Sequence, residues 1–219
     1  MTNILNKYWK RANLAACILA IVPYIRFIGV NGSLAKNKIN RKSDIDFLIF
    51  TKQSRIWTCR FFCIILLKTF GLKTSKNKNS CLICLNRFQS ENNLEILPHE
   101  YYTAYNYSST IPIFDIDNLY KQFLKQNQWM RKFIKFPKIT AKIVKINSFV
   151  NYIRIFLEWV LNSQIGSWFE KKVKLYQIKK IINNPLIASQ KGVVIVNSDM
   201  VCFHPKSKGK INIYSIEKM

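Results

Sequence analysis

The chain has 219 residues, of which 49% are hydrophobic and 14% aromatic, and its 35 basic and 11 acidic side chains give a formal net charge of +24. The hydrophobic content excludes a disordered protein, and the length is sufficient for one substantial core or for a compact domain with an extension. The charge permits binding to nucleic acid or to an anionic surface, although the abundant Lys, Asn and Ile also match a codon bias of the genome.

Neither a membrane span nor a secretory signal is expected. The chain has no run of about 18 consecutive apolar residues, which is the length that crosses a bilayer as a helix. Its amino-terminal segment has no small-residue cleavage site after a clean apolar core. We therefore expect a soluble, cytoplasmic protein.

The six cysteines are expected to be reduced and buried, because most of them lie within apolar runs. They are Cys17, Cys59, Cys63, Cys81, Cys84 and Cys202. A four-thiolate zinc site built from the middle four is the alternative, but the run between Cys81 and Cys84 is strand-like and lacks the turn residues of a zinc knuckle.

The first half of the chain predicts two helices and three strands. Apolar residues at helical spacing predict the helices, and short runs rich in β-branched and aromatic residues predict the strands. In chain order these are a helix over residues 3–22, strands over 25–30 and 46–50, a helix over 53–70 and a strand over 81–88. Pro23 ends the first helix, Gly71 ends the second, and a polar basic loop over residues 73–80 precedes the third strand.

Beyond Pro98, helical patterns predominate until close to the C-terminus. They cover residues 99–109, 119–129, 144–169 and 171–182, and three short strands follow at 192–197, 200–204 and 211–216. The tyrosines of the first of these helices are expected to pack against the sheet, with base stacking as the alternative.

Several polar residues of this second half have predicted structural roles. Asp115 and Asp117 form an Asp-x-Asp before a helical pattern, and Asp117 is predicted to be the N-cap of that helix and not a metal ligand. Glu158 lies within a long apolar pattern, and we expect Arg154, one turn earlier, to be its partner. His204 is predicted to be a buried hydrogen-bonding residue, with a catalytic role as the alternative.

Two short motifs lie where the first two predicted strands end and begin. Gly32 and Ser33 follow the first strand, and Asp44 and Asp46 open the second. Residues two apart on a strand point to the same face, so both carboxylates are directed to one place. Two close carboxylates repel each other, and a bound cation relieves that cost. Oxygen ligands of this kind suit Mg²⁺ or Mn²⁺.

The Gly-Ser step adds a backbone that allows close approach, exposed N–H groups and a hydroxyl, all of which suit a phosphate. Asp44 and Asp46 are the only acidic residues in the first 90 positions, which favours a site over generic surface charge. The alternative is a loop in which Ser43 and Asp44 form local turn hydrogen bonds.

The stretch over residues 26–50 resembles the polymerase β-like nucleotidyltransferase superfamily. In that superfamily a strand, a Gly-Ser step and an Asp-x-Asp that opens the next strand follow one another, as they do here, and the resemblance extends as a domain over residues 10–96. It implies that Asp44 and Asp46 hold two Mg²⁺ ions about 4 Å apart, which activate the attacking hydroxyl and steady the triphosphate.

The resemblance also implies roles for the residues around the aspartates. Gly32 and Ser33 would hold the β- and γ-phosphates of an NTP, and Lys36 or Arg41 would offset their charge. We also consider the solvated loop as the alternative for these two cations.

The superfamily places a third carboxylate in the strand that corresponds to residues 81–88, and this chain has none there. Asn86 is the most suitable polar residue of that run. Glu95, in the run over residues 93–97 that is expected to form a neighbouring strand, is the candidate substitute and is expected to join the aspartates in catalysis.

We therefore predict an α/β (α+β) protein with a small mixed sheet and flanking helices. Residues 1–97 are expected to form the nucleotidyltransferase-like domain, and residues 98–219 a mostly helical region with short terminal strands. The predicted reaction transfers a nucleoside monophosphate from an NTP, ATP in the first place, to a hydroxyl of RNA, protein or a small molecule. The alternative is a weak or inactive module of the same fold that binds RNA or DNA through its basic surface.

Overall fold

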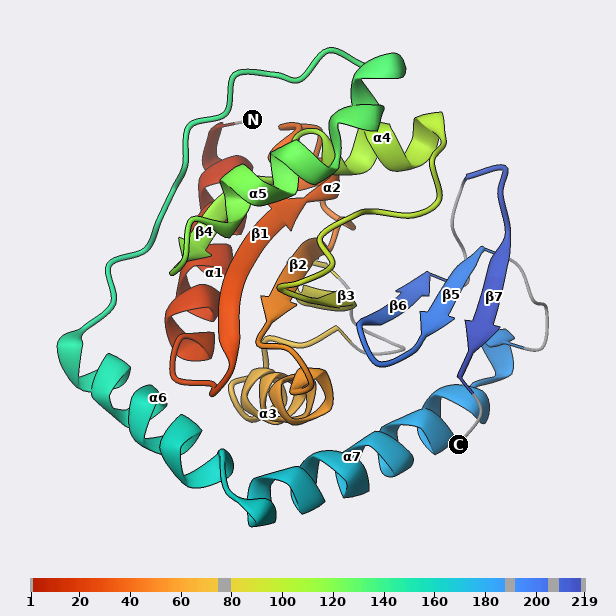
Figure 1. Cartoon of the computed structure of the whole chain (residues 1–219). Helices are drawn as coiled ribbons and strands as arrows, with labels where there is room; N and C mark the ends of the chain where they lie inside the picture. The colour runs from red at the N-terminus through yellow and green to blue at the C-terminus, as the bar shows by residue number, and fades with distance from the viewer. Residues whose placement is uncertain (1, 75–79, 188–191, 205–208, 218–219) are drawn as a thin grey trace.

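The computed structural model describes residues 2–74, 80–187, 192–204 and 209–217 (Figure 1). The helices are α1 (Thr2–Leu19), α2 (Gly32–Ala35), α3 (Ile56–Thr69), α4 (Tyr101–Tyr107), α5 (Leu119–Gln126), α6 (Ser148–Leu161) and α7 (Gln164–Ile182), with 3-10 turns at Gln128–Lys132 and Pro185–Ile187. The strands are β1 (Ile25–Asn31), β2 (Ile45–Thr51), β3 (Ile83–Ser90), β4 (Ile111–Asp115), β5 (Val193–Val196), β6 (Met200–His204) and β7 (Ile213–Ile216).

All of these strands form one mixed sheet, in the order β4-β1-β2-β3-β6-β5-β7. β1 is antiparallel to β2 and β4, and β6 is antiparallel to β3 and β5, whereas β2 is parallel to β3 and β5 is parallel to β7. The predicted α/β (α+β) class, with a mixed sheet and flanking helices, is confirmed. Strands from both predicted regions, 1–97 and 98–219, lie in this sheet.

The sheet has a hydrophobic core on each face, because side chains alternate along its central strands. Phe47 and Ile49 of β2 belong to the larger cluster, which includes buried residues of α1, α3 and α7. Leu48 and Phe50, between and after them, belong to the smaller cluster together with Phe123 of α5. In Figure 1, α5 passes in front of β1 while α1 lies behind it.

The predicted helices of the first half are confirmed as α1 and α3. Gly71 follows the last residues of α3 with φ of +63°, a left-handed conformation that glycine adopts without steric cost and that ends helices. Of the predicted loop over residues 73–80, residues 75–79 lie outside the described part of the chain. Among the helices that the structure describes, none combines the length and the apolar character needed to cross a membrane.

The prediction of one helix over residues 144–169 is wrong. α6 starts only at Ser148 and ends at Leu161, and α7 begins three residues later as a separate helix. Figure 1 shows the two helices meeting at an angle along the outer edge of the molecule. Gly166, in the first turn of α7, lies against the end of α6, where a Cβ would overlap the Leu161 carbonyl oxygen.

β4 was not predicted, and it forms one edge of the sheet beside β1. The chain before α6 runs along its other side, where the backbone N–H groups of Lys142 and Val144 donate to the carbonyl oxygens of Pro112 and Ile113, both at 2.9 Å. The extended segment at residues 134–147 therefore covers part of the edge that β4 would expose.

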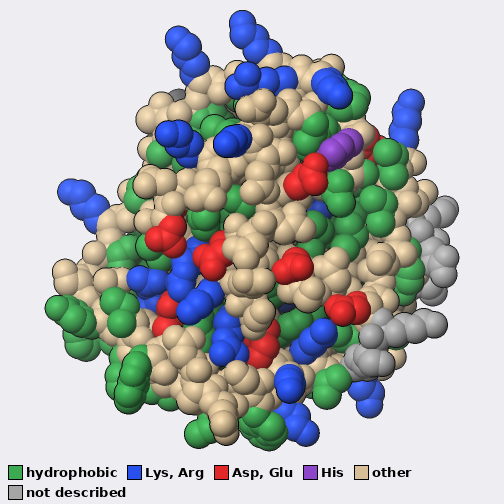
Figure 2. Space-filling model, in the orientation of Figure 1, with side chains coloured by type: hydrophobic (Ala, Val, Ile, Leu, Met, Phe, Trp, Pro, Cys, Tyr) green, Lys and Arg blue, Asp and Glu red, His purple; other side chains and the backbone are tan. Residues whose placement is uncertain are grey.

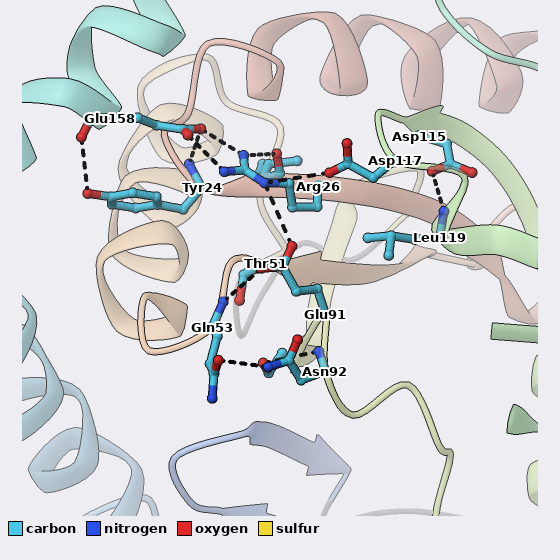
Figure 3. Close-up of polar contacts among 12 residues, drawn as sticks. Tyr24, Arg26, Thr51, Gln53, Glu91, Asn92, Asp115, Asp117, Leu119 and Glu158 are labelled. Carbon is cyan, nitrogen blue, oxygen red and sulfur yellow. Dashed lines mark hydrogen bonds and ion pairs between the residues drawn. The ribbon is translucent and has the colours of Figure 1, made fainter. Parts of the chain in front are cut away.

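A half-buried ion-pair centre joins α6 to β1 (Figure 3). The guanidinium of Arg26 donates two hydrogen bonds to Glu158, each at 2.8 Å, and the backbone N–H of Tyr24 donates a third at 2.8 Å. The predicted contact of Glu158 with Arg154 is present at 3.4 Å, so Arg154 is the more distant of two arginines on this carboxylate. Together these bonds lower the pKa of Glu158 against the effect of burial, which raises it.

Candidate active site

Asp46 lies between the ends of two neighbouring strands. It pairs with Asn31 at the end of β1 and with Cys84 at the start of β3. Asp44 precedes it by two residues and shares its direction. Each of Asp44, Asp46 and Cys84 places one ligand atom so that the three atoms lie within 4.8 Å of one another. The structure thus brings the two predicted aspartates together and adds Cys84, a neighbour that the sequence analysis did not propose.

The predicted glycine-serine turn directly adjoins the aspartates. Gly32 has φ of +67°, and a Cβ at this position would overlap Oδ2 of Asp46. Any larger residue would therefore be strained in its backbone and would also displace the carboxylate. Ser33 follows as the second residue of the short helix α2 and is half-buried.

Lys36 also lies at the site, whereas the side chain of Arg41 is exposed on the loop before β2. The Lys36 ammonium donates a hydrogen bond of 2.8 Å to Asn106 and lies 3.7 Å from the ring centre of Tyr105, so α4 holds it in place. Burial lowers the pKa of Lys36 to about 8, and the charge of Asp46 opposes that shift.

The cluster concentrates negative charge in a partly buried place. Burial raises the pKa of Asp46 to about 7, the charge of Asp44 raises it further, and Lys36 opposes the shift. Burial also raises the pKa of Asp44, and burial together with both carboxylates raises the pKa of the Cys84 thiol. Neither aspartate forms an ion pair with a described lysine or arginine.

These residues fit a divalent cation, because a cation would compensate two partly desolvated carboxylates that form no ion pair with a described lysine or arginine. Their donor set is two oxygens and one sulfur. Carboxylates alone favour Mg²⁺ or Mn²⁺, and a thiolate shifts the preference toward softer metals. The alternative four-thiolate zinc site is not assembled by the described residues, since Cys84 groups with the aspartates and Cys59 and Cys63 lie on the buried side of α3, in the core.

Glu95 and Asn86 occupy different surroundings. Glu95 pairs with His99 at 3.0 Å on a partly exposed surface and does not belong to the described metal-ligand group. Its run, residues 93–97, is not a strand, so that prediction is wrong. Asn86 lies two residues beyond Cys84 on β3. The strand register makes Cys84, and not Asn86, the direct neighbour of Asp46. A catalytic role for Glu95 stays a prediction.

The sequence analysis missed Cys84 because it looked for polar residues in the third strand. The signal that finds it is strand register: Asp46 and Cys84 are direct neighbours on parallel strands. Register depends on how β2 and β3 pair, and the sequence of either strand alone does not fix it.

A family model described as a nucleotidyltransferase domain matches residues 13–185, well over half of the chain. The match includes Gly32, Ser33, both aspartates and Cys84. No curated protein and no solved structure matches the chain.

Proposed function

The chain belongs to the nucleotidyltransferase domain family of the polymerase β-like superfamily, and on that premise we propose that it transfers a nucleoside monophosphate from an NTP to a hydroxyl acceptor. The hydroxyl oxygen attacks the α-phosphorus, the bond to the bridging oxygen breaks, and pyrophosphate leaves with the electron pair. The observation that supports this proposal is the close approach of Gly32 to Asp46, since it joins a candidate phosphate-binding turn to a candidate metal ligand.

Asp44 and Asp46 would hold one or two divalent ions, Mg²⁺ or Mn²⁺. When bound, such ions stabilise the charge on the triphosphate and lower the pKa of the attacking hydroxyl. Gly32 and Ser33 would contact the β- and γ-phosphates, and Lys36 is placed to offset their charge. Arg41, with its exposed side chain, would take part only from the loop at the edge of the site.

The proton of the attacking hydroxyl needs an acceptor. Cys84 lies where a third acidic group would be most useful, but burial and the two carboxylates raise the pKa of its thiol. That leaves Asp44, Asp46 and the predicted Glu95 as the carboxylates from which the acceptor would come. ATP is the first NTP to test.

The proposal is tested by incubating the purified chain with Mg²⁺ or Mn²⁺ and each α-labelled NTP, with RNA, protein and small hydroxyl compounds as acceptors. We expect label transfer with at least one acceptor, and its loss in Asp44→Ala and Asp46→Asn. Asp117→Asn is the matched control, because it makes the same change in the second Asp-x-Asp of the chain. Transfer that survives both substitutions at the site would refute the assignment.

Substitutions of Cys84 provide a second, independent test of metal binding. Cys84→Asp would supply three carboxylates, and we expect the ratio of activity with Mg²⁺ to activity with Mn²⁺ to rise, because oxygen ligands favour the harder ion. Cys84→Ser is the control that removes the thiol without adding a charge. Without any turnover, Co²⁺ binding provides the readout: a thiolate-to-metal charge-transfer absorption in the wild type should be absent in Cys84→Ser.

The absence of a third carboxylate from the described metal-ligand group favours a second candidate, a weak or inactive module that binds RNA or DNA. The net charge of +24 supports phosphate contacts. On the face that Figure 2 shows, however, most basic side chains stand apart, and those below the centre are interleaved with acidic ones. RNA binding that weakens steeply with salt, without NTP consumption, would favour this candidate.

A further inference from the structure

A buried arginine lines the pocket that Asp46 also lines. Arg87 of β3 is 2% exposed, and it lines the same cavity, of about 150 Å³, as Gly32 and Asp46. β6 forms one wall through Cys202, its direct strand neighbour, and α4 forms another wall. The cavity therefore connects the candidate metal site to a guanidinium.

The hydrogen bonds of this guanidinium are incomplete. Nη2 donates to the carbonyl oxygen of Leu97 at 2.8 Å and lies 3.8 Å from the sulfur of Met200. Nε and Nη1 are buried, and neither forms a well-aligned hydrogen bond with a described residue, although Cys202 and Tyr107 lie close enough to raise the pKa of Arg87 against the effect of burial. The Tyr107 ring lies 5.1 Å from the guanidinium carbon, and burial raises the pKa of its hydroxyl, so tyrosine supplies no negative charge.

Arg87 also lacks a counterion, unlike Arg154, the other arginine in the buried set of described residues, and unlike the half-buried Arg26. Arg26 binds Glu158 through two hydrogen bonds of 2.8 Å. No described carboxylate lies within ion-pair distance of Arg87. A buried cation without a counterion has an unfavourable energy, and a bound anion would relieve it. The Arg87 guanidinium is therefore well suited to bind an anionic ligand.

His204 lies on the same pocket wall and is neutral. Burial and the nearby charge of Arg87 lower the pKa of His204 to about 3. A neutral imidazole offers one donor and one acceptor, so it would complete the hydrogen bonds of a ligand without adding charge. Arg87 therefore supplies the positive charge among the residues that line this pocket, and Asp46 supplies the negative charge.

We propose that Arg87, with His204 beside it, forms a subsite for an oxyanion, a phosphate or carboxylate group of the acceptor substrate. A guanidinium binds either group with two parallel hydrogen bonds. The proposal rests on the proposed function, in which Gly32, Ser33 and Lys36 contact the triphosphate on the side of Asp46 nearer α2. The acceptor hydroxyl would then be presented to the α-phosphorus from the Arg87 side.

The test measures equilibrium binding of inorganic phosphate, and separately of ATP with Mg²⁺, to the full chain by calorimetry. We expect Arg87→Met to weaken phosphate binding by about 10- to 100-fold, the usual range for losing hydrogen bonds to a charged group, and to change ATP binding by less than about 3-fold. Arg131→Met, the same change at an exposed arginine, is the matched control and should alter neither.

A second variant keeps the test decisive if Arg87→Met does not fold. Cys202→Asp would place a carboxylate beside Arg87 and occupy the subsite from within, so phosphate binding should again be lost. Phosphate binding equal to wild type in the folded variants, or its absence from the wild type, would overturn the proposal. An equal loss of ATP and phosphate binding would also overturn it, since Arg87 would then bind a phosphate of the NTP and not an oxyanion of the acceptor. Failure of nucleotidyl transfer with intact, Arg87-dependent phosphate binding would instead refute the proposed function alone.

Discussion

The chain contains two Asp-x-Asp motifs, and both lie beside β1. Asp44 and Asp46 open β2, opposite the end of β1, whereas Asp115 closes β4 opposite Phe27, near the start of β1. The two motifs therefore occupy opposite ends of the same strand. Their surroundings differ. Asp44 and Asp46 lie beside the thiol of Cys84, whereas Asp117 of the second motif lies near Arg26 (Figure 3).

The second motif is compensated by the protein itself. The Asp115 carboxylate accepts the backbone N–H groups of Leu119 at 2.9 Å and Tyr120 at 3.2 Å, at the start of α5. Burial raises the pKa of Asp115, and these two bonds oppose the shift. The prediction that Asp117 caps this helix is wrong, because Asp115 does so and the N-cap residue is Asn118.

The comparison teaches that spacing alone does not identify a metal site. The protein provides two backbone N–H groups for Asp115 and Arg26 for Asp117, whereas no described lysine or arginine forms an ion pair with Asp44 or Asp46. The uncompensated pair is the one that has an unfavourable energy until a cation binds. Four substitutions test this distinction, and we take them from the largest expected effect to the smallest.

Asp46→Asn should abolish most of the activity while sparing the fold. We expect nucleotidyl transfer to fall by at least about 10²- to 10³-fold, as for other losses of a charge-stabilising group. The free energy of unfolding should stay level or rise, because the substitution removes a desolvated carboxylate. Label transfer and urea denaturation measure the two effects. Reduced stability with intact transfer would place Asp46 among the structural residues.

The unfolding free energy of the same variant should also depend on pH differently from that of the wild type, when a chelator keeps metal ions from the site. The pKa of Asp46 is raised to about 7 in the folded chain from an ordinary value of 3.8. The folded state therefore binds this proton more tightly than the unfolded state does. Its contribution to stability is complete below about pH 4 and is lost as the pH rises to about 7. The unfolding free energy of Asp46→Asn should fall less than that of the wild type across this window.

Glu158→Ala should have the largest effect on stability. It leaves the half-buried Arg26 without the partner of its two short hydrogen bonds, and we expect a cost of up to about 3 kcal/mol, the lower end of the range for breaking a buried pair. Urea denaturation should detect the loss. Glu217→Ala breaks the exposed pair with Lys174 and should cost less than about 1 kcal/mol. Equal effects of the two changes would mean that the Arg26 centre does not hold α6 to β1.

The sequence predicts the strands of this sheet well where an apolar run ends at turn residues, as in β1, β2 and β5. It missed β4 because Pro112 lies inside that run, and proline is tolerated in a sheet only at an edge such as this one. Helical periodicity continues across the break between α6 and α7. The close contact of Gly166 with Leu161 is tertiary and is not visible in that pattern.

The site was predicted only in part, because the sequence shows local motifs and does not show tertiary contacts. The Gly-Ser turn and both aspartates are local motifs, and the structure brings them together. Cys84 and Arg87 join them only through the pairing of β3 with β2 and β6, which long-range register decides. Neither residue type signals a site by itself, since buried cysteines are common and arginines are usually exposed.

Asp115→Ala should lower the free energy of unfolding by about 1 kcal/mol, the usual cost of losing a helix cap. Nucleotidyl transfer should stay within about 2-fold of the wild type, because Asp115 lies at the far end of β1 from the site. Asp115→Asn, which keeps an oxygen acceptor for the two N–H groups, should recover most of the loss. An activity loss in Asp115→Ala without unfolding would contradict the assignment of this motif to structure.

Asp117→Ala should have the smallest effect. Its carboxylate is 3.9 Å from Nε of Arg26, its side chain is 54% exposed, and Arg26 is already bound by Glu158. An exposed pair of this kind contributes less than about 0.5 kcal/mol, and salt screens it further. Urea denaturation at low and high salt measures the contribution. A loss as large as that of Glu158→Ala would mean that Arg26 depends on both carboxylates. It would contradict the assignment of Asp117 to an exposed pair of small effect.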